Sequence, residues 1–282
     1  MQLAGLQKTT LVDFPGIVAA TVFSRGCSFR CHFCHNPELV LPEKFNPLIP
    51  EEDFFNFLLE RVGKLGGVCI TGGEPLLQPD IAEFISHIKA LGFKVKLDTN
   101  GSFPDRLDQI IKDGDVDYIA MDIKSQLDKY QLVTNPKSLP ADASHQAMQA
   151  GEIRNSKSFD FAQDRQIQNS KLKAQDNNFP QFRIIKQLNN WTIEQLILRS
   201  IKSIMNSNID YEFRTTFVKP LHQVEDAEGI GKLIKGAKRY YIQNFQKSKH
   251  INPEMDFQPF SEKGLKQLLL IIKKFVPNSA IR

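Results

Sequence analysis

Short apolar runs alternate with amphipathic stretches along most of this chain, and the alternation predicts strands and helices in turn. Six runs rich in β-branched and aromatic residues have the length and composition of buried strands: Ile17–Phe23, Val68–Thr71, Phe93–Asp98, Tyr118–Ile123, Tyr211–Val218 and Arg239–Phe245. Between and after them, apolar residues recur at helical spacing over Pro50–Val62, Pro79–Ala90, Pro104–Lys112, Thr192–Asn206, Val224–Lys235 and Ser261–Phe275. Strands that alternate with helices predict an α/β fold built on a parallel sheet.

One segment breaks this pattern. Residues 141–180 are rich in Gln, Asn, Ser and Lys, and they follow neither the helical nor the strand period. Such a composition is typical of disorder, and a long structureless stretch inside a compact domain indicates an insertion. We expect a single domain over 1–282 with a disordered, low-complexity insertion at 141–180.

Composition and charge exclude some functions. Hydrophobic residues make up 41% and charged residues 24% of the 282 residues, which is ordinary for a globular protein with a buried core. The net charge of +4 is too small over this length to indicate a nucleic-acid surface. No apolar run approaches the roughly 20 residues of a membrane span, and the N-terminus lacks a secretory signal pattern. We expect a cytoplasmic protein that binds neither nucleic acid nor membranes.

Candidate chemistry is concentrated directly after the first predicted strand. Cys27, Cys31 and Cys34 are spaced C-x3-C-x2-C and are three of the chain's four cysteines. A structural zinc site needs four Cys or His ligands, whereas iron–sulfur clusters are held by closely spaced thiolates, and three of them leave one iron open. A zinc site completed by a neighbouring histidine or by Cys69 is the alternative, although Cys69 lies in an apolar strand where a small buried thiol is expected.

Polar motifs follow three further strands, at the end of the sheet where α/β proteins bind ligands. Gly72–Glu74 follow the second strand, and paired glycines let the backbone approach a ligand closely. Asp98–Gly101 end the third strand, and Asp122–Lys124 end the fourth. Arg214 lies inside the otherwise apolar fifth strand, so we expect it to face a polar interior or to pair with Glu212.

The cysteine spacing and the Gly-Gly-Glu segment resemble the radical S-adenosylmethionine (SAM) superfamily. The Val12–Gly16, Phe23–Cys27 and Cys34–Pro37 segments resemble its glycyl-radical-enzyme activating enzymes. The LVDFPG and YEFRTT segments are most similar to the long form of the activating proteins for anaerobic ribonucleoside-triphosphate reductase. The resemblance covers most of residues 5–134 and 191–245, and it implies a partial (β/α)6 barrel, a parallel sheet with the helices outside.

The resemblance also implies two cofactors and the residues that hold them. Cys27, Cys31 and Cys34 would ligate a 4Fe-4S cluster. S-adenosyl-L-methionine would contact Phe33, Gly72, Gly73, Glu74, Asp98, Asn100, Lys124, Arg214 and His222. Glu74 is expected at the amino group of SAM and Lys124 at its carboxylate, while Asp98 and Asp122 share a monovalent cation beside it.

The implied activity is that of a radical SAM oxidoreductase. An external donor such as flavodoxin or ferredoxin supplies an electron, SAM is cleaved to methionine and a 5′-deoxyadenosyl radical, and a glycine of a partner glycyl-radical enzyme loses its Cα hydrogen. The implied partner is anaerobic ribonucleotide reductase. Two alternatives stay open: a radical SAM enzyme with another small-molecule or peptide substrate, and a non-catalytic zinc-binding interaction protein.

Overall fold

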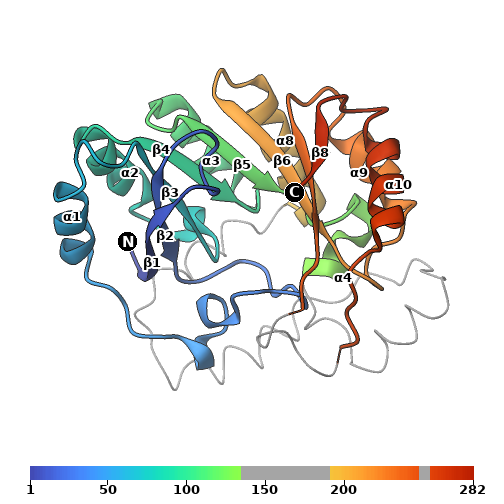
Figure 1. Ribbon diagram of the computed structural model, residues 1–282, viewed down its shortest axis with the longest axis horizontal. Helices are drawn as coiled ribbons and strands as arrows, with labels where there is room; N and C mark the ends of the chain where they lie inside the picture. Colours follow the sequence, from blue (N-terminus) through green and yellow to red (C-terminus); the bar gives the residue numbers. More distant parts are fainter. Residues whose placement is uncertain (135–190, 248–254) are drawn as a thin grey trace. The chain divides into compact units, whose positions relative to one another are not determined.

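An eight-stranded sheet organises the part of the chain that the computed structural model describes, namely residues 1–134, 191–247 and 255–282 (Figure 1). The strands are β1 (Leu3–Thr10), β2 (Ala19–Ser24), β3 (Gly67–Gly72), β4 (Lys94–Thr99), β5 (Tyr118–Asp122), β6 (Asp210–Phe217), β7 (Tyr240–Asn244) and β8 (Ser279–Ile281). They lie side by side in sequence order. Only the β1–β2 pair is antiparallel within this sheet, and every later pair is parallel. Because β1 and β8 do not pair, the sheet is open.

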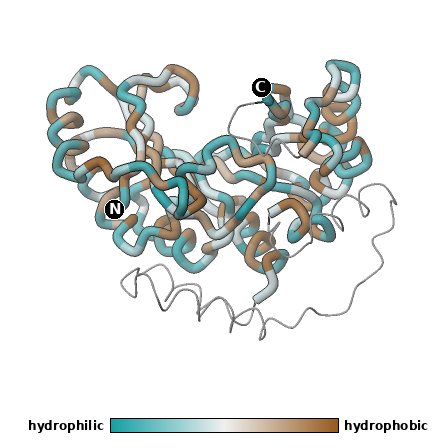
Figure 2. Tube along the Cα trace, turned by 90° about the horizontal axis from the view of Figure 1, so that it is seen from below, coloured by the Kyte–Doolittle hydropathy of each residue, from teal (hydrophilic) through white to brown (hydrophobic). Residues whose placement is uncertain are grey.

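Helices connect the parallel strands and lie outside the sheet (Figure 1). The longer ones among the described residues are α1 (Glu51–Leu59), α2 (Ile81–Ala90), α3 (Pro104–Asp113), α8 (Ile193–Asn206), α9 (Asp226–Leu233) and α10 (Glu262–Ile272). Short turns of helix are η1 (Pro37–Leu39), η2 (Pro42–Lys44), η3 (Pro75–Leu77), η4 (Leu127–Lys129) and α4 (Tyr130–Thr134). Hydrophobic and hydrophilic positions alternate along these helices (Figure 2). Each longer helix therefore buries one face.

Local sequence signals fix where several helices begin and end. α8 begins with a capping box, in which Thr192 and Gln195 each accept a hydrogen bond from the other's backbone. The Ser261 hydroxyl caps the N-terminus of α10. α3 begins with Pro104 and ends at Gly114, whose φ of 77° is the left-handed conformation that glycine adopts without strain.

Alternation along β6 shows how the sheet positions the site. Tyr211, Phe213 and Phe217 are buried apolar residues, whereas Arg214 and Thr216 line a polar cavity on the opposite face. Successive strand residues point to opposite faces. The outer face of the sheet thus packs against helices, while the inner face carries polar chemistry.

The structure confirms the α/β fold and the six predicted strand–helix units, and it corrects the number of strands. β1 was missed because most of its side chains are at least partly exposed, so it lacks the apolar run of a buried strand. β8 has only 3 residues, too few for a periodic pattern. No helix in the described ranges has both the length and the apolar character that crossing a membrane requires. The predicted insertion at 141–180 lies outside the described residues.

Candidate functional site

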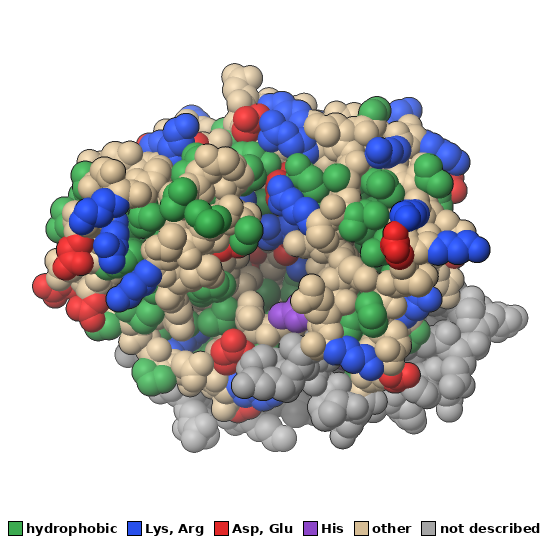
Figure 3. All heavy atoms as spheres, in the orientation of Figure 1, with side chains coloured by type: hydrophobic (Ala, Val, Ile, Leu, Met, Phe, Trp, Pro, Cys, Tyr) green, Lys and Arg blue, Asp and Glu red, His purple; other side chains and the backbone are tan. Residues whose placement is uncertain are grey.

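A cavity of about 650 Å³ lies on the inner face of the sheet, at the carboxyl ends of the parallel strands. Its walls come from the loop after β2, from the ends of β3, β4 and β5, and from β6 and β7. Gln7 of the edge strand β1 and Arg282 beyond the edge strand β8 also line it. The molecular surface is hollowed on this face, with Lys and Arg side chains along the upper side of the hollow (Figure 3). The cavity therefore extends to both edges of the open sheet.

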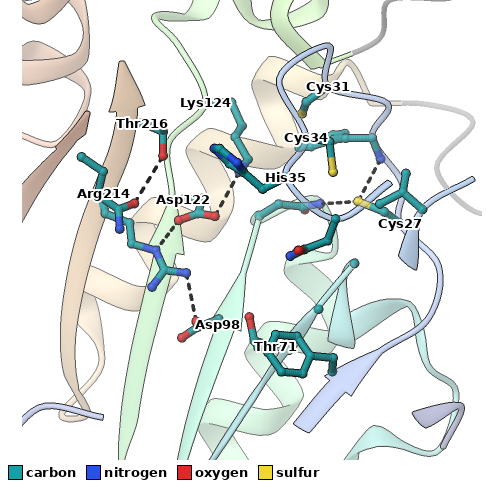
Figure 4. A pocket seen from close by; sticks show the side chains of 18 of the residues that line it. Cys27, Cys31, Cys34, His35, Thr71, Asp98, Asp122, Lys124, Arg214 and Thr216 are labelled. Atoms are coloured by element: carbon teal, nitrogen blue, oxygen red, sulfur yellow. Dashed lines mark hydrogen bonds and ion pairs between the residues drawn. The ribbon is translucent and has the colours of Figure 1, made fainter. Parts of the chain in front are cut away.

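The three clustered cysteines lie on one loop and line this cavity together (Figure 4). Backbone hydrogen bonds shape the loop: Gly26 N donates to Leu39 O at 2.7 Å, and Arg30 N donates to Thr134 O at 2.7 Å. The Arg30 guanidinium also donates to the carbonyl of Cys27 at 2.7 Å. These bonds hold Cys27, Cys31 and Cys34 close together without a disulfide.

The thiols of this loop indicate which kind of metal centre it could hold. Burial raises the pKa of Cys27 to about 11 and that of Cys31 to about 12, so a cationic centre is needed to hold them as thiolates. No three His, Cys, Asp or Glu side chains in the described ranges are arranged around a single ion. Cys69 is fully buried and does not line the cavity. Three thiols without a fourth protein ligand fit an iron–sulfur cluster with an open position better than a closed zinc site.

The glycines after β3 support the base of the cysteine loop. Gly73 N donates to Ser24 O at 3.0 Å, and Glu74 N donates to Gly26 O at 2.8 Å. A Cβ atom on Gly73 would lie 2.0 Å from the carbonyl oxygen of Gly26. The sequence indicated a close backbone approach to a ligand here. The approach that the structure shows is to the protein's own chain, beside Cys27.

Replacing Gly73 with Ala is expected to destabilise the fold by about 1–3 kcal/mol, at the upper end of the range for overpacking because the clash is with backbone. The free energy of unfolding in guanidinium chloride measures the loss. Gly264→Ala in α10 is the matched control, since its Cβ would meet only side-chain atoms, the nearest at 3.2 Å. Equal stability of the two variants would contradict this account of Gly73.

Glu74 has a different position from the one that the sequence indicated. Its carboxylate is completely buried and is not among the cavity-lining groups. It accepts hydrogen bonds from Leu76 N at 3.0 Å, Thr99 Oγ1 at 2.9 Å and Asn100 N at 2.6 Å. Burial raises the pKa of Glu74 to about 7, although these three donors oppose the shift. The carboxylate thus joins the end of β3 to the end of β4.

Asn100 connects this junction to the cysteine loop. Its side-chain Nδ2 lies 3.6 Å from Cys27 Sγ and 3.2 Å from Ser28 Oγ, donating to both. Its Oδ1 accepts from Ser102 N at 2.9 Å. The polar atoms of Asn100 are therefore fixed on three sides, and one of its N–H groups is directed at a predicted cluster ligand.

Five charged side chains on and directly after β4, β5 and β6 form a chain of alternating sign, and Figure 4 shows four of them, Asp98, Arg214, Asp122 and Lys124. In order they are Lys96, Asp98, Arg214, Asp122 and Lys124. Arg214 Nη2 donates to Asp98 at 3.0 Å, and Lys124 Nζ donates to Asp122 at 3.0 Å. Arg214 faces the polar interior as expected, but the alternative pairing with Glu212 is wrong. Glu212 instead pairs with Arg282 at 2.7 Å.

Electrostatics keep the two carboxylates of this chain of charges ionised at neutral pH. Burial alone would raise the pKa of Asp98, but Arg214 and Lys96 outweigh it and hold the pKa below its usual value. Arg214 and Lys124 lower the pKa of Asp122 in the same way, against the effect of burial. Two cations of this chain, Arg214 and Lys124, line the cavity. They are suited to an anionic group of a ligand.

Phe33 and His222 occupy different positions relative to the cavity. Phe33 lines it, and its ring lies 6.1 Å from the His222 ring. His222 is buried and is not among the lining residues. Its Nε2 lies 2.8 Å from the carbonyl oxygen of Lys124, and its Nδ1 accepts from Val218 N at 3.2 Å. His222 thus contacts the backbone of Lys124 and does not reach the cavity.

Sequence reasoning missed Lys96, which is almost completely buried. Its ammonium group pairs with Asp98 and lies 3.7 Å from Cys69 Sγ. Lys96 and Asp98 are two positions apart on β4, so they share one face of the strand. That spacing is a signal in the sequence that could have identified Lys96.

The chain is similar in sequence to proteins of one superfamily. The family model described as the radical SAM superfamily matches residues 21–150. A Methanocaldococcus jannaschii protein named as a glycyl-radical enzyme activating enzyme is 28% identical over 285 residues, covering 99% of this chain and 95% of that protein. The pyruvate formate-lyase-activating enzyme of Clostridium pasteurianum is 33% identical, but the match covers 47% of this chain and 57% of that enzyme.

Solved structures show the same fold at low sequence identity. Streptococcus suis SuiB bound to S-adenosylmethionine matches with a TM-score of 0.55 and 12% identity, over 92% of this chain and 48% of SuiB. HydG, a maturase of the FeFe-hydrogenase, matches with a TM-score of 0.54 and 11% identity, over 93% of this chain and 50% of HydG. This chain thus spans about half the length of each. By these matches the chain is similar to the radical SAM superfamily over residues 21–150, and to a protein named as a glycyl-radical-enzyme activating enzyme over nearly its whole length.

Proposed function

We propose that this chain activates a glycyl-radical enzyme, and that its partner is anaerobic ribonucleoside-triphosphate reductase. The observation that carries the proposal is the cavity, which three free cysteines line together with the ion-paired side chains of Asp98, Arg214, Asp122 and Lys124. The family relationship supplies the reaction class, and the LVDFPG and YEFRTT segments support the choice of partner.

The cofactors follow from this assignment. Cys27, Cys31 and Cys34 would hold a 4Fe-4S cluster, and the cavity beside them would hold SAM. A reduced cluster bound there would supply the one electron that cleaves SAM to methionine and a 5′-deoxyadenosyl radical, and this radical would take a hydrogen atom from a glycine Cα of the partner. The chain's four cysteines leave no ligand set for a second cluster, so an external donor such as flavodoxin or ferredoxin supplies the electron.

Residues of this chain bind and orient the ligand in the proposed site. The cations that line the cavity, Arg214 and Lys124, attract the carboxylate of SAM, and Lys124 is the one nearer the cysteine loop. Asn100 donates a hydrogen bond to Cys27 Sγ, and hydrogen bonds to sulfur tune a cluster. The buried ring of Phe33 excludes water from the region between the loop and His222.

The open side of the sheet supports a protein substrate. Sites for small molecules usually bury 70–90% of the ligand surface. This cavity instead reaches Gln7 at one edge of the open sheet and Arg282 at the other. A loop of a folded partner enters such a cavity from the side, and its glycine then reaches the wall that carries the cysteines.

Electron paramagnetic resonance tests the proposal. The reconstituted chain, SAM and reduced flavodoxin are incubated anaerobically with anaerobic ribonucleotide reductase or with pyruvate formate-lyase. We expect a glycyl radical signal in the reductase and none in a reductase whose radical-bearing glycine is replaced by alanine. A signal in the lyase alone would show that the partner is wrong, and SAM cleavage without a radical in either enzyme would show that the substrate is of another kind.

A further inference from the structure

Arg214 lies between the two aspartates that the sequence assigned to a monovalent cation. Its Nη2 donates to Asp98 Oδ2 at 3.0 Å, and its Nε donates to Asp122 Oδ1. One guanidinium group thus bridges side chains from two neighbouring strands, β4 and β5, from its own position on β6. In Figure 4 it occupies the space between the two carboxylates.

The remaining carboxylate oxygens are also taken by side-chain cations. Lys96 Nζ donates to Asp98 Oδ1, and Lys124 Nζ donates to Asp122 Oδ2 at 3.0 Å. All four oxygens of the pair therefore carry a charge-assisted hydrogen bond from nitrogen. A bound metal cation needs oxygen ligands in its coordination shell. Each carboxylate oxygen keeps a second lone pair, but a cation bound there would lie beside Arg214, Lys96 or Lys124 and be repelled by it. The monovalent cation does not fit the residues present.

Because these charge pairs are buried, ions from the solvent do not readily displace Arg214 from the two aspartates. The side chains of Arg214 and Asp98 are 15% and 11% exposed. Removing one partner of a buried charge pair is costly because the other charge stays behind unpaired. Surface arginines that bridge two aspartates, such as Arg199 with Asp105 and Asp108, face no such penalty because water screens them.

We propose that Arg214 is the built-in counter-cation of this site, so that SAM binding requires no free monovalent cation. The proposal rests on the assignment of the cavity as the SAM site. Arg214 screens the two aspartates from each other and from the carboxylate of SAM. Lys124, which also lines the cavity, gives a ligand carboxylate a second cation beside Arg214.

The wild-type chain gives the first test. SAM affinity of the cluster-loaded protein is measured by anaerobic equilibrium dialysis in Na⁺, K⁺, Cs⁺ or tetramethylammonium chloride at equal ionic strength. We expect dissociation constants that agree within about twofold, a difference well below the tenfold that corresponds to 1.4 kcal/mol. A dissociation constant that rises tenfold or more in tetramethylammonium would overturn the proposal.

Arg214→Ala gives the second test. In tetramethylammonium chloride we expect its SAM affinity to fall about 30-fold or more, the effect of truncating one partner of a buried charge pair. K⁺ or guanidinium ion should restore part of that affinity, because each can enter the vacated space and neutralise the aspartates. The melting temperature of the variant should also rise in these salts relative to tetramethylammonium. Arg199→Ala, which removes a surface arginine with the same two-aspartate bridge, should show neither response.

The outcomes separate this proposal from the proposed function. If neither the SAM affinity nor the melting temperature of a folded Arg214→Ala variant changes when K⁺ or guanidinium is added, Arg214 only fills space. The proposal then fails. If the wild type binds no SAM in any salt, the proposed function fails, and the melting temperatures alone decide the role of Arg214. If Arg214→Ala does not fold, Arg214→Lys replaces it, with the same ions expected to raise its SAM affinity, and no response would count against the proposal.

Discussion

Replacing Cys31 with Ala is expected to reduce the iron and sulfide bound after anaerobic reconstitution by at least about tenfold. The described cavity offers three thiols on one loop, and iron–sulfur clusters depend on their thiolate ligands. Two remaining thiols cannot hold three irons, and the fourth cysteine, Cys69, is fully buried and does not line the cavity. Iron and sulfide per chain, together with the visible absorbance of the cluster, measure the effect.

Cys69→Ala is the matched control for this prediction. Cys69 is fully buried on β3 but does not line the cavity, so its loss should cost about 1 kcal/mol of stability and leave the bound iron unchanged. The account of the cysteine loop would be contradicted if Cys31→Ala kept its iron. It would also be contradicted if Cys69→Ala lost as much iron as Cys31→Ala.

Replacing Glu74 with Ala is expected to lower the free energy of unfolding by about 3–5 kcal/mol. The change leaves the backbone N–H groups of Leu76 and Asn100 and the Thr99 hydroxyl without their buried acceptor. Each unsatisfied buried donor costs about 1–3 kcal/mol, less where water enters the space. Denaturant titration measures the loss, and Glu60→Ala on the surface should stay within about 0.5 kcal/mol of the wild type.

The pH dependence of Glu74→Gln tests the same carboxylate without changing its size. Burial raises the pKa of Glu74 to about 7 from its usual 4.5, so between these pH values the native state binds more protons than the unfolded state. Stability contributed by this group therefore falls as pH rises from 4.5 through 7. The advantage of the wild type over Glu74→Gln should be largest below about pH 5 and should shrink toward pH 8. An advantage that grows with pH would show that Glu74 is ionised throughout.

The fold was largely readable from the sequence because its parallel strands are buried on both faces. Runs such as Val68–Thr71 are continuously apolar, and the helices between strands carry strong periodicity. β1 gives no such signal, since it is an edge strand with polar, exposed positions such as Gln7 and Lys8. Its pairing with β2 is a tertiary contact that local pattern does not encode.

The site was readable in part, for a related reason. Spacing located the cysteine loop and the strand ends, because these features are local. The direction of a side chain depends on distant partners: Glu74 turns inward toward Thr99 and Asn100, and Arg214 bridges Asp98 and Asp122 from more than 90 positions away. The sequence therefore predicted that Glu74 would bind SAM and that the two aspartates would bind a cation. In the structure their carboxylate oxygens accept hydrogen bonds from other groups of the protein.

The central claim is that the cysteine loop and the cavity beside it form a radical SAM centre. The most direct test is to reconstitute the chain anaerobically with iron and sulfide, add SAM and dithionite, and quantify 5′-deoxyadenosine and methionine by chromatography. The account predicts both products in equal amounts, formed only when the reductant and the cluster are present. A protein that takes up zinc, assembles no iron–sulfur cluster and leaves SAM intact would contradict it.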